Sequence, residues 1–502
     1  MSTEQDGLLP AASAEPPPHA STGIKGLDTI LKGGFPREEL HLVQGSAGTG
    51  KTTMALQFLI EGARLGEPAL YLTLSQSAPH LERIARSHGW SLDGITVHEL
   101  GPATLAERIA AKQSILPTAE VKLEEAFREL MQLVQRLRPR RAVIDSLTIL
   151  QLIAGSTERY HREVVNLRQL FFEHGCTVVA LADHPAIVDE GQAPEVIFHP
   201  LSGCVINLEQ EARVYGDARR RLRVIKARGV ANEAGVHDLR IDTGGMLVYP
   251  RLGAYTEPEQ GEHQCLATQV AGLDALVGGG LFTGTSCLIV GPSGVGKSTL
   301  ASLYAETAAL KGQHASVFLF DEPPQTYVQR AEALGVRLAK PVSAGLVTIC
   351  QLDPGNVAPG EFAQMARDAI DQRDTKVVIV DSVNGYFTAM GSAELFLSQL
   401  HELITYATRR GVLLILCGAQ EGFMSIGTQG AFDVSYLSDA LLVLAFFEEE
   451  GHIRRAISAV KKKHGKHRNT INELLLADGR IEVSAEPLKG LRNLMVPARS
   501  AG

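Results

Sequence analysis

Two segments of this chain have the residue types and the spacing that bind phosphate. Each fits the pattern Gly-x-x-x-x-Gly-Lys-(Ser/Thr), in which glycines let the backbone wrap closely around an anion and the amide N–H groups point at it. They predict two sites for a nucleoside triphosphate. Each extended by one threonine, the segments are Gly45-Ser46-Ala47-Gly48-Thr49-Gly50-Lys51-Thr52-Thr53 and Gly291-Pro292-Ser293-Gly294-Val295-Gly296-Lys297-Ser298-Thr299.

The lysine and the following hydroxyl of such a loop have separate tasks. We expect Lys51 and Lys297 to reach the β- and γ-phosphates, and Thr52 and Ser298 to hold Mg²⁺. A glycine turn formed by chance is the alternative. The strand expected before each loop and the helix expected after it argue against that alternative, because they are the context that this motif requires.

Two aspartates are candidates to complete the magnesium sites. The apolar segments 141–146 and 376–382 place Asp145 and Asp381 at the ends of expected strands. In an open α/β sheet the carboxyl ends of the strands border the crevice where ligands bind. Each carboxylate can therefore orient Mg²⁺ through water, as a Walker B acid does. A helix N-cap role is the alternative.

The residues after the second strand of each half differ in the chemistry that they allow. The C-terminal half has Asp321 and Glu322, where the N-terminal half has Ser75 and Gln76. A carboxylate can polarise or deprotonate an attacking water, whereas a glutamine can orient water but cannot accept its proton. We expect the first site to be impaired for hydrolysis and the second to be competent. The alternative is that both segments are surface turns and that another residue performs the chemistry.

Cations late in each half are candidates for a role in a neighbouring subunit. The N-terminal half has Lys226 and Arg228, and the C-terminal half has Lys461 and Lys463. A cation that reaches a neighbour's γ-phosphate stabilises charge in the transition state, as an arginine finger does. A solvated basic face is the alternative. The second half is one residue longer here and lacks the arginine, so the pairing of these residues stays open.

The two halves are copies of one fold. The loop lysines differ by 297 − 51 = 246 residues, and the strand-end aspartates by 381 − 145 = 236 residues, so about ten residues differ between these points. Strands before each loop, helices over about 52–64 and 298–310, and further buried strands alternate along both halves. This order predicts an α/β protein with two tandem phosphate-binding domains, each a mostly parallel sheet with helices on both faces.

Composition divides the chain further. The regions that we predict are a flexible tail (1–20), an N-terminal domain (21–252), a linker (253–264), a C-terminal domain (265–487) and an extension (488–502). No apolar run reaches the roughly 18 residues of a membrane span, and no signal peptide is recognised. The six cysteines lack metal-ligand spacing and favour a cytoplasmic protein.

These elements together resemble the KaiC family of circadian-clock ATPases, within the RecA-like superfamily. The resemblance runs from the segment Ser21-Thr22-Gly23-Ile24-Lys25-Gly26-Leu27-Asp28 to about Leu488. It implies ATP and Mg²⁺ as ligands, two stacked rings, a homohexamer with ATP between subunits, slow hydrolysis, and autophosphorylation in the C-terminal ring. A KaiB-like partner or a two-component signalling partner is compatible with it, although nothing in the sequence specifies one.

The resemblance carries over to individual residues. Asp321 and Glu322 match the family's paired catalytic glutamates, and Ser75 and Gln76 stand where the first domain has its pair. The family's phosphorylated Ser-Thr pair falls at Ser435, followed by a tyrosine in place of the threonine. The resemblance thus implies autokinase activity at Ser435 alone. A turn that leads into a strand is the alternative interpretation of that segment.

Two rival functions belong to other classes. A DNA-dependent RecA-like motor is disfavoured because the net charge is −8 and the chain has a single tryptophan, whereas single-strand channels combine basic grooves with stacking rings. A nearly inactive ATP-gated scaffold is the second rival. It would bind a partner without meaningful turnover.

Overall fold

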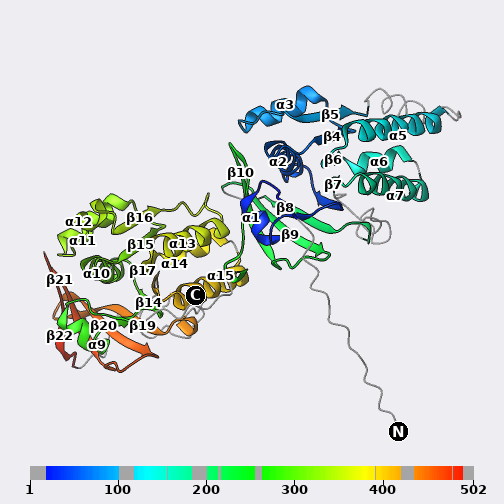
Figure 1. Ribbon diagram of the computed structural model, residues 1–502. Coiled ribbons are helices and arrows are strands. Elements are labelled where there is room, and N and C mark those ends of the chain that lie inside the picture. The colour runs from blue at the N-terminus through cyan, green and yellow to red at the C-terminus, as the bar shows by residue number, and fades with distance from the viewer. Residues whose placement is uncertain are drawn as a thin grey trace, which may run out of the picture. The chain divides into compact units, whose positions relative to one another are not determined.

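The computed structural model describes residues 19–100, 118–154, 156–183, 200–212, 216–254, 263–390, 392–419, 435–477 and 479–489. The chain forms two compact units, which meet along the sequence between Pro250 and Arg251 (Figure 1). Most of the predicted tail, linker and C-terminal extension lies outside the described residues. Leu252, at the predicted end of the first domain, is buried in the core of the second unit together with residues of α15 (Ala393–Arg409).

The N-terminal unit is built on a nine-stranded sheet with the order β11-β10-β9-β8-β3-β7-β6-β4-β5. The strands from β8 to β5 pair in parallel, and β8 to β11 form an antiparallel extension. The strands are β3 (Leu40–Gly45), β4 (Ala69–Thr73), β5 (Ile95–Glu99), β6 (Arg141–Asp145), β7 (Thr177–Asp183), β8 (Cys204–Glu211), β9 (Arg219–Ala227), β10 (Val236–Asp242) and β11 (Gly245–Tyr249).

The C-terminal unit repeats this topology strand for strand. Its order is β16-β15-β17-β18-β14-β19-β20-β21-β22, with β19 to β22 antiparallel. The strands are β14 (Ser286–Gly291), β15 (His314–Leu319), β16 (Val347–Gln351), β17 (Thr375–Asp381), β18 (Leu413–Ala419), β19 (Ala440–Glu449), β20 (His452–Lys462), β21 (Ile471–Ala477) and β22 (Arg480–Pro487). The predicted duplication is therefore visible in the strand order of both units.

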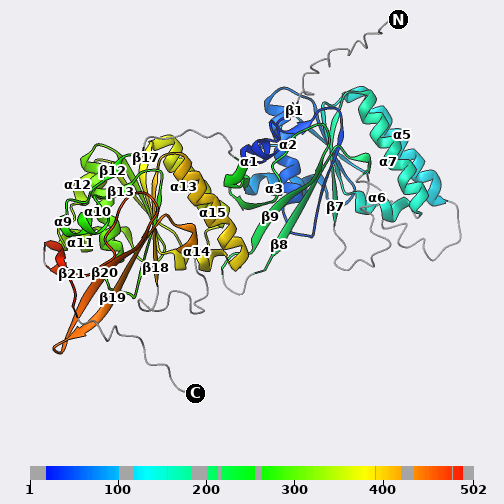
Figure 2. The same ribbon diagram turned by 90° about the horizontal axis from the view of Figure 1, so that it is seen from below.

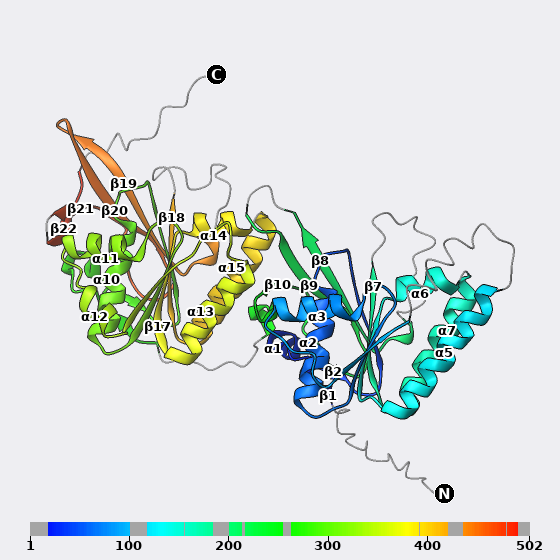
Figure 3. The same cartoon turned by 90° about the horizontal axis from the view of Figure 1, so that it is seen from above.

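Helices cover both faces of each sheet (Figures 2 and 3). In the N-terminal unit α1 (Lys25–Ile30), α2 (Lys51–Arg64) and α3 (Ala78–Ser87) pack on one face, and α5 (Thr118–Leu137), α6 (Leu147–Ala154) and α7 (Thr157–Glu173) on the other. In the C-terminal unit the first layer is α9 (Ala271–Leu276), α10 (Lys297–Leu310), α11 (Pro324–Ala333) and α12 (Ala339–Ser343). The second layer is α13 (Pro359–Arg373), α14 (Val383–Met390) and α15.

The central strands show why this layering follows from the sequence. Along β14, Cys287 and Ile289 belong to the core on one face, and Leu288 and Val290 to the core on the other. A strand buried on both faces needs an apolar run rather than an alternating one, which is the pattern of this segment. The predicted fold class is confirmed. Among the described residues, no helix is long and apolar enough to cross a bilayer.

Candidate active sites

Both glycine loops connect a central strand to a helix at the carboxyl edge of the sheet. β3 ends at Gly45 and α2 begins at Lys51; β14 ends at Gly291 and α10 begins at Lys297. The residue before each helix is a glycine with a positive φ, 103° at Gly50 and 115° at Gly296. A left-handed backbone of this kind costs a glycine little, and it leaves the helix N-terminus open toward an anion.

The two loop lysines are held in the same way by their own loops. The Nζ of Lys51 donates to the carbonyl oxygens of Gly45 (2.8 Å) and Ser46 (2.9 Å). The Nζ of Lys297 donates to those of Gly291 (2.8 Å) and Pro292 (2.9 Å). Burial lowers the pKa of Lys297, and the nearby charges of Asp381 and Asp321 oppose that shift. Both loops therefore present a lysine at the place where a phosphate would bind.

The residues for a magnesium site fit best in the C-terminal unit. Asp381 lies at the end of β17 and accepts a hydrogen bond from the Ser298 hydroxyl, while its Oδ2 is buried without a hydrogen-bond partner. Burial raises the pKa of Asp381, opposed by that hydrogen bond and by the charges of Arg330 and Lys297. Mg²⁺ is often held by one or two carboxylates together with substrate phosphates.

The corresponding carboxylate of the N-terminal unit already has a protein partner. Tyr71 on β4 donates its hydroxyl to Oδ2 of Asp145 (2.6 Å) and shares a hydrogen bond with Thr52. Burial raises the pKa of Asp145, and this hydrogen bond opposes the shift. The residue at the matching position of β15 is Val317, which cannot make such a bond. Tyr71 thus ties the aspartate to the hydroxyl that would share Mg²⁺ with it.

The two acids of the C-terminal unit lie beside these groups. Oδ2 of Asp321 accepts a hydrogen bond of 2.6 Å from Ser382, which follows Asp381. Glu322 forms an ion pair of 2.6 Å with Arg330 of α11. Burial raises the pKa of Glu322; the Arg330 charge opposes the shift, and the charges of Asp381 and Asp321 add to it. Glu322 therefore lies near enough to the candidate magnesium carboxylate, Asp381, for the two charges to influence each other.

Backbone hydrogen bonds show that Ser75 and Gln76 occupy the matching place in the N-terminal unit. The N–H of Leu74 donates to the Asp145 carbonyl (2.6 Å), as that of Phe320 does to the Asp381 carbonyl (2.8 Å). Oε1 of Gln76 is buried without a hydrogen-bond partner in the described part of the chain. The geometry of the two turns is therefore shared, and only the second turn carries carboxylates.

Lys226 and Arg228 lie at the end of their sheet opposite the loop, where the parallel strands begin. They lie at the end of β9, which runs antiparallel to β8, so that Val205 near the start of β8 pairs with Lys226. The six residues of β3 separate the two edges by roughly 20 Å. These cations cannot serve the loop of their own unit.

Strand register settles which cations of the two units correspond. Leu441, the counterpart of Val205, pairs with Lys461, so Lys461 matches Lys226. The N–H of Lys463 donates to the Asp439 carbonyl (2.9 Å) as that of Arg228 does to the Gly203 carbonyl (2.8 Å). Lys463 therefore matches Arg228, and the extra residue of the second half lies after Lys463, before Gly465.

Ser435 lies at that same far edge of the C-terminal unit. It begins the short 3-10 helix η3 (Ser435–Leu437), and its carbonyl oxygen accepts hydrogen bonds from Lys461 (3.0 Å) and from the hydroxyl of Ser438 (3.0 Å). The candidate phosphosite thus neighbours a candidate trans cation, and both lie at the edge remote from the loop of their own unit.

Sequence comparisons cover both units. The family described as "ATPase: KaiC" matches residues 20–253 and 266–487. The chain belongs to the KaiC family of ATPases. It is 26% identical over 467 residues to the circadian clock protein KaiC2 of Synechocystis sp., covering 92% of this chain and 80% of that protein. It is 25% identical over 463 residues to the circadian clock oscillator protein KaiC of Synechococcus elongatus, covering 91% and 87%.

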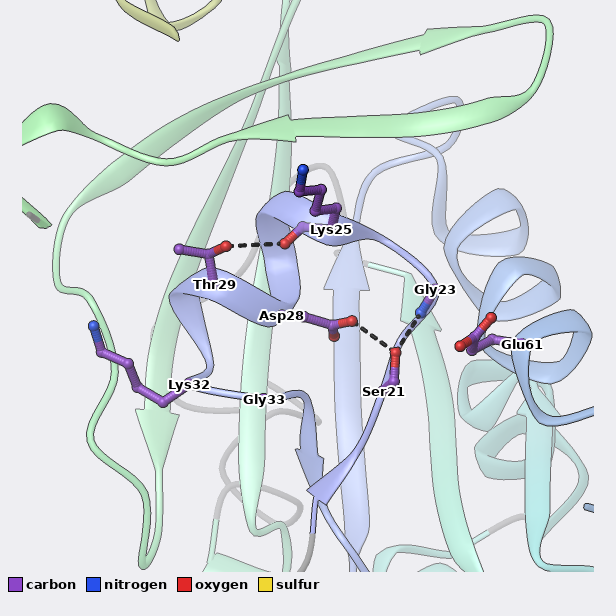
Figure 4. A pocket seen from close by; sticks show the side chains of 8 residues that line it. All are labelled: Ser21, Gly23, Lys25, Asp28, Thr29, Lys32, Gly33 and Glu61. Atoms are coloured by element: carbon purple, nitrogen blue, oxygen red, sulfur yellow. Dashed lines mark hydrogen bonds between the residues drawn. The ribbon is translucent and has the colours of Figure 1, made fainter. Parts of the chain in front are cut away.

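The opening segment of the KaiC resemblance has a structural role. Part of it, including Lys25 and Asp28, lines an open surface pocket together with Lys32 and Glu61 (Figure 4). The carboxylate of Asp28 accepts hydrogen bonds from the Ser21 hydroxyl (2.8 Å) and from the Thr22 N–H (2.8 Å) and hydroxyl (2.7 Å). The C-terminal unit repeats the Thr22 bonds with Thr268 and Asp274. This segment fixes the chain ahead of the first central strand of each KaiC domain, and we assign it no ligand.

Sequence reasoning missed two contacts of the N-terminal KaiC domain. One is the Tyr71–Asp145 hydrogen bond, and the other is an ion pair of 2.9 Å between Lys51 and Asp183 at the end of β7. The available signal was the difference between the halves: the residues that match Tyr71 and Asp183 are Val317 and Ala419. Both contacts join residues that are distant in the sequence. Predicting them would have required the strand order in addition to the alignment of the two halves.

Arg330 gives a prediction on the pH dependence of this KaiC-family ATPase. Its charge lowers the pKa of Glu322, so in Arg330→Leu that pKa rises above its value in the parent. A base must be deprotonated to act, and activity is lost as the pH falls through its pKa. The acidic limb of the ATPase pH–rate profile should therefore move to higher pH. The matched control is Arg337→Leu, which removes the ion pair with Glu306 and should leave the limb in place; an unmoved limb in both variants would contradict the assignment.

Proposed function

We propose that this protein is a ring-forming tandem ATPase in which the C-terminal site hydrolyses ATP and the N-terminal site mainly holds it. One observation carries the proposal. In one unit Asp321 interacts electrostatically with Lys297, and Glu322 with Asp381. The equivalent turn of the other unit carries a serine and a glutamine. Membership of the KaiC family supports the ATPase assignment for both domains.

The proposed roles in the C-terminal site follow from these contacts. Lys297 and the backbone of 291–296 bind the phosphates. Ser298 and Asp381 hold Mg²⁺, which when bound neutralises charge that develops on the phosphates. Glu322 orients and deprotonates the attacking water, and Asp321, fixed by Ser382, faces the same end of the site. In the N-terminal site Lys51, Thr52 and Asp145 bind ATP and Mg²⁺ without an acid at the position of Glu322.

The placement of the cations supports a homohexamer. A loop at one edge of each sheet and cations at the other edge suit a ring in which one subunit completes the site of the next. In this arrangement Lys226 and Arg228, and likewise Lys461 and Lys463, approach the γ-phosphate that the neighbouring subunit holds. Positive charge at that place stabilises the transition state of phosphoryl transfer.

A KaiB-like or two-component signalling partner is a secondary proposal. It rests on the names of the KaiC relatives, which describe them as clock oscillator proteins.

A serine autokinase activity is the finer part of the proposal. Ser435 shares its edge with Lys461, so a neighbour's γ-phosphate is the one that its hydroxyl would receive. The neighbouring tyrosine, Tyr436, is 60% exposed.

A cytoplasmic location fits the six unpaired cysteines, four of which are buried.

Incubation of the full-length protein with γ-labelled ATP and Mg²⁺ tests the proposal. We expect released labelled phosphate together with label on Ser435, and the label on protein should be absent from Ser435→Ala. Release without protein label would leave an ATPase that is not an autokinase. Recovery of intact ATP from both sites after long incubation would indicate the scaffold instead. A rate that single-stranded DNA raises severalfold would indicate the motor.

Restoring the missing acid should add turnover to the N-terminal site. In Gln76→Glu we expect a measurable ATPase rate in a Glu322→Gln background, in which the C-terminal contribution is removed. A general base commonly contributes 10²–10⁴-fold, so even a partly aligned carboxylate should be detectable. The matched control is Gln57→Glu on α2, outside the turn. No gain over the background would mean that the missing acid is not what limits this site.

A further inference from the structure

We propose that Asp183 sets the nucleotide preference of the N-terminal site by competing with the γ-phosphate for Lys51. The inference rests on the proposed binding of ATP at this loop and goes beyond it. Asp183 ends β7, which lies between the loop strand β3 and the strand of Asp145. Its Oδ1 is 2.9 Å from Nζ of Lys51.

The carboxylate of Asp183 is the anionic partner of the loop lysine. An ammonium group has three donors. In Lys51 two donors go to carbonyl oxygens of the loop, and Oδ1 of Asp183 lies within ion-pair distance of the same nitrogen. The lysine side chain is 10% exposed, whereas that of Asp183 is 48% exposed. A γ-phosphate that binds Lys51 must therefore displace this carboxylate or lie beside it.

The C-terminal unit shows the same backbone without the acid. Gly45 pairs with Asp183 in one sheet, and Gly291 pairs with Ala419 in the other. The N–H of Asp183 donates to Oγ1 of Thr148 (2.8 Å), and that of Ala419 to Oδ1 of Asn384 (2.7 Å). Both strand ends are held in this way. The two units therefore differ at this position in the side chain, an aspartate in one and an alanine in the other.

The charge of Asp183 acts differently on the two nucleotides. Two negative groups that share one cation repel each other and weaken each other's binding. ATP brings both its β- and its γ-phosphate to Lys51. ADP brings only the β-phosphate, and so places less negative charge beside Asp183. The N-terminal site should consequently favour ATP over ADP less strongly than the C-terminal site does.

The test measures dissociation constants for labelled ATP and ADP by equilibrium dialysis on full-length protein carrying Lys297→Ala, so that only the N-terminal loop binds. Asp183→Asn and Asp183→Ala should each bind ATP about tenfold more tightly, roughly the effect of one partly exposed ion pair plus the relieved repulsion. ADP binding should change much less. The control Asp93→Asn removes an exposed acid at the opposite edge of the same sheet and should change neither value.

The outcomes separate this inference from the proposed function. If the Lys297→Ala parent binds neither nucleotide, the proposed N-terminal ATP site is wrong and this inference falls with it. If the parent binds ATP and the ratio of the two constants stays unchanged in both Asp183 variants, only the inference is overturned. The reciprocal change Ala419→Asp should raise the KM for ATP of the C-terminal site about tenfold.

Discussion

Glu322→Gln is expected to lower the steady-state ATPase rate of the full-length protein by about 100-fold or more, the usual contribution of a general base. Glutamine keeps the size and polarity of the side chain, and its amide oxygen can still pair with Arg330. What it loses is the ability to take a proton from water. ATP binding at the C-terminal site should change little, because Lys297 and the loop backbone supply the phosphate contacts.

Glu332→Gln is the matched control for this variant. Glu332 lies on the same helix, α11, and its Oε1 accepts a hydrogen bond from the N–H of Ala339, which a glutamine can also accept. Phosphate release by the control should equal that of the parent. If Glu322→Gln retains most of the parental rate while it binds ATP normally, the hydrolytic acid is elsewhere, and Asp321 becomes the next residue to replace.

The sequence predicted those parts of the fold that depend on local pattern. The helix predicted over 52–64 is α2, Lys51–Arg64, and the one over 298–310 is α10, Lys297–Leu310. Apolar runs of five to seven residues identified the strands that end at Asp145 and Asp381. The duplication then aligned Ser75 and Gln76 with Asp321 and Glu322, because no residue is inserted between each loop and the following turn.

Contacts across the sheet could not be predicted in the same way. That Lys461 is the equivalent of Lys226 follows from a register irregularity that β19 and β20 share with β8 and β9. Neither irregularity has a signature in the local sequence. The Lys51–Asp183 pair requires β7 to neighbour β3, although 132 residues separate the two side chains (183 − 51 = 132). Strand order is a property of the whole sheet, so these contacts emerged only from the folded chain.

Lys51→Ala is expected to dissociate the hexamer in the presence of ATP. We propose that nucleotide in the N-terminal site organises the ring, with the loop of one subunit and the Lys226 edge of the next contacting the same triphosphate. Removing one partner of such a charged contact costs ~2–5 kcal/mol, since the other charge is left unpaired. Light scattering with saturating ATP and Mg²⁺ should then report the mass of a monomer where the parent gives that of a hexamer.

Lys297→Ala is the control that gives the Lys51→Ala result its meaning. The two lysines make equivalent bonds to their own loops, so both substitutions remove the same group from the same geometry. Lys297→Ala should stop hydrolysis yet keep the hexameric mass, whereas Lys51→Ala should lose the mass. Hexamers that persist in Lys51→Ala, or dissociation by both variants alike, would contradict a division of labour between the sites. Assembly would then depend on protein contacts or on both nucleotides equally.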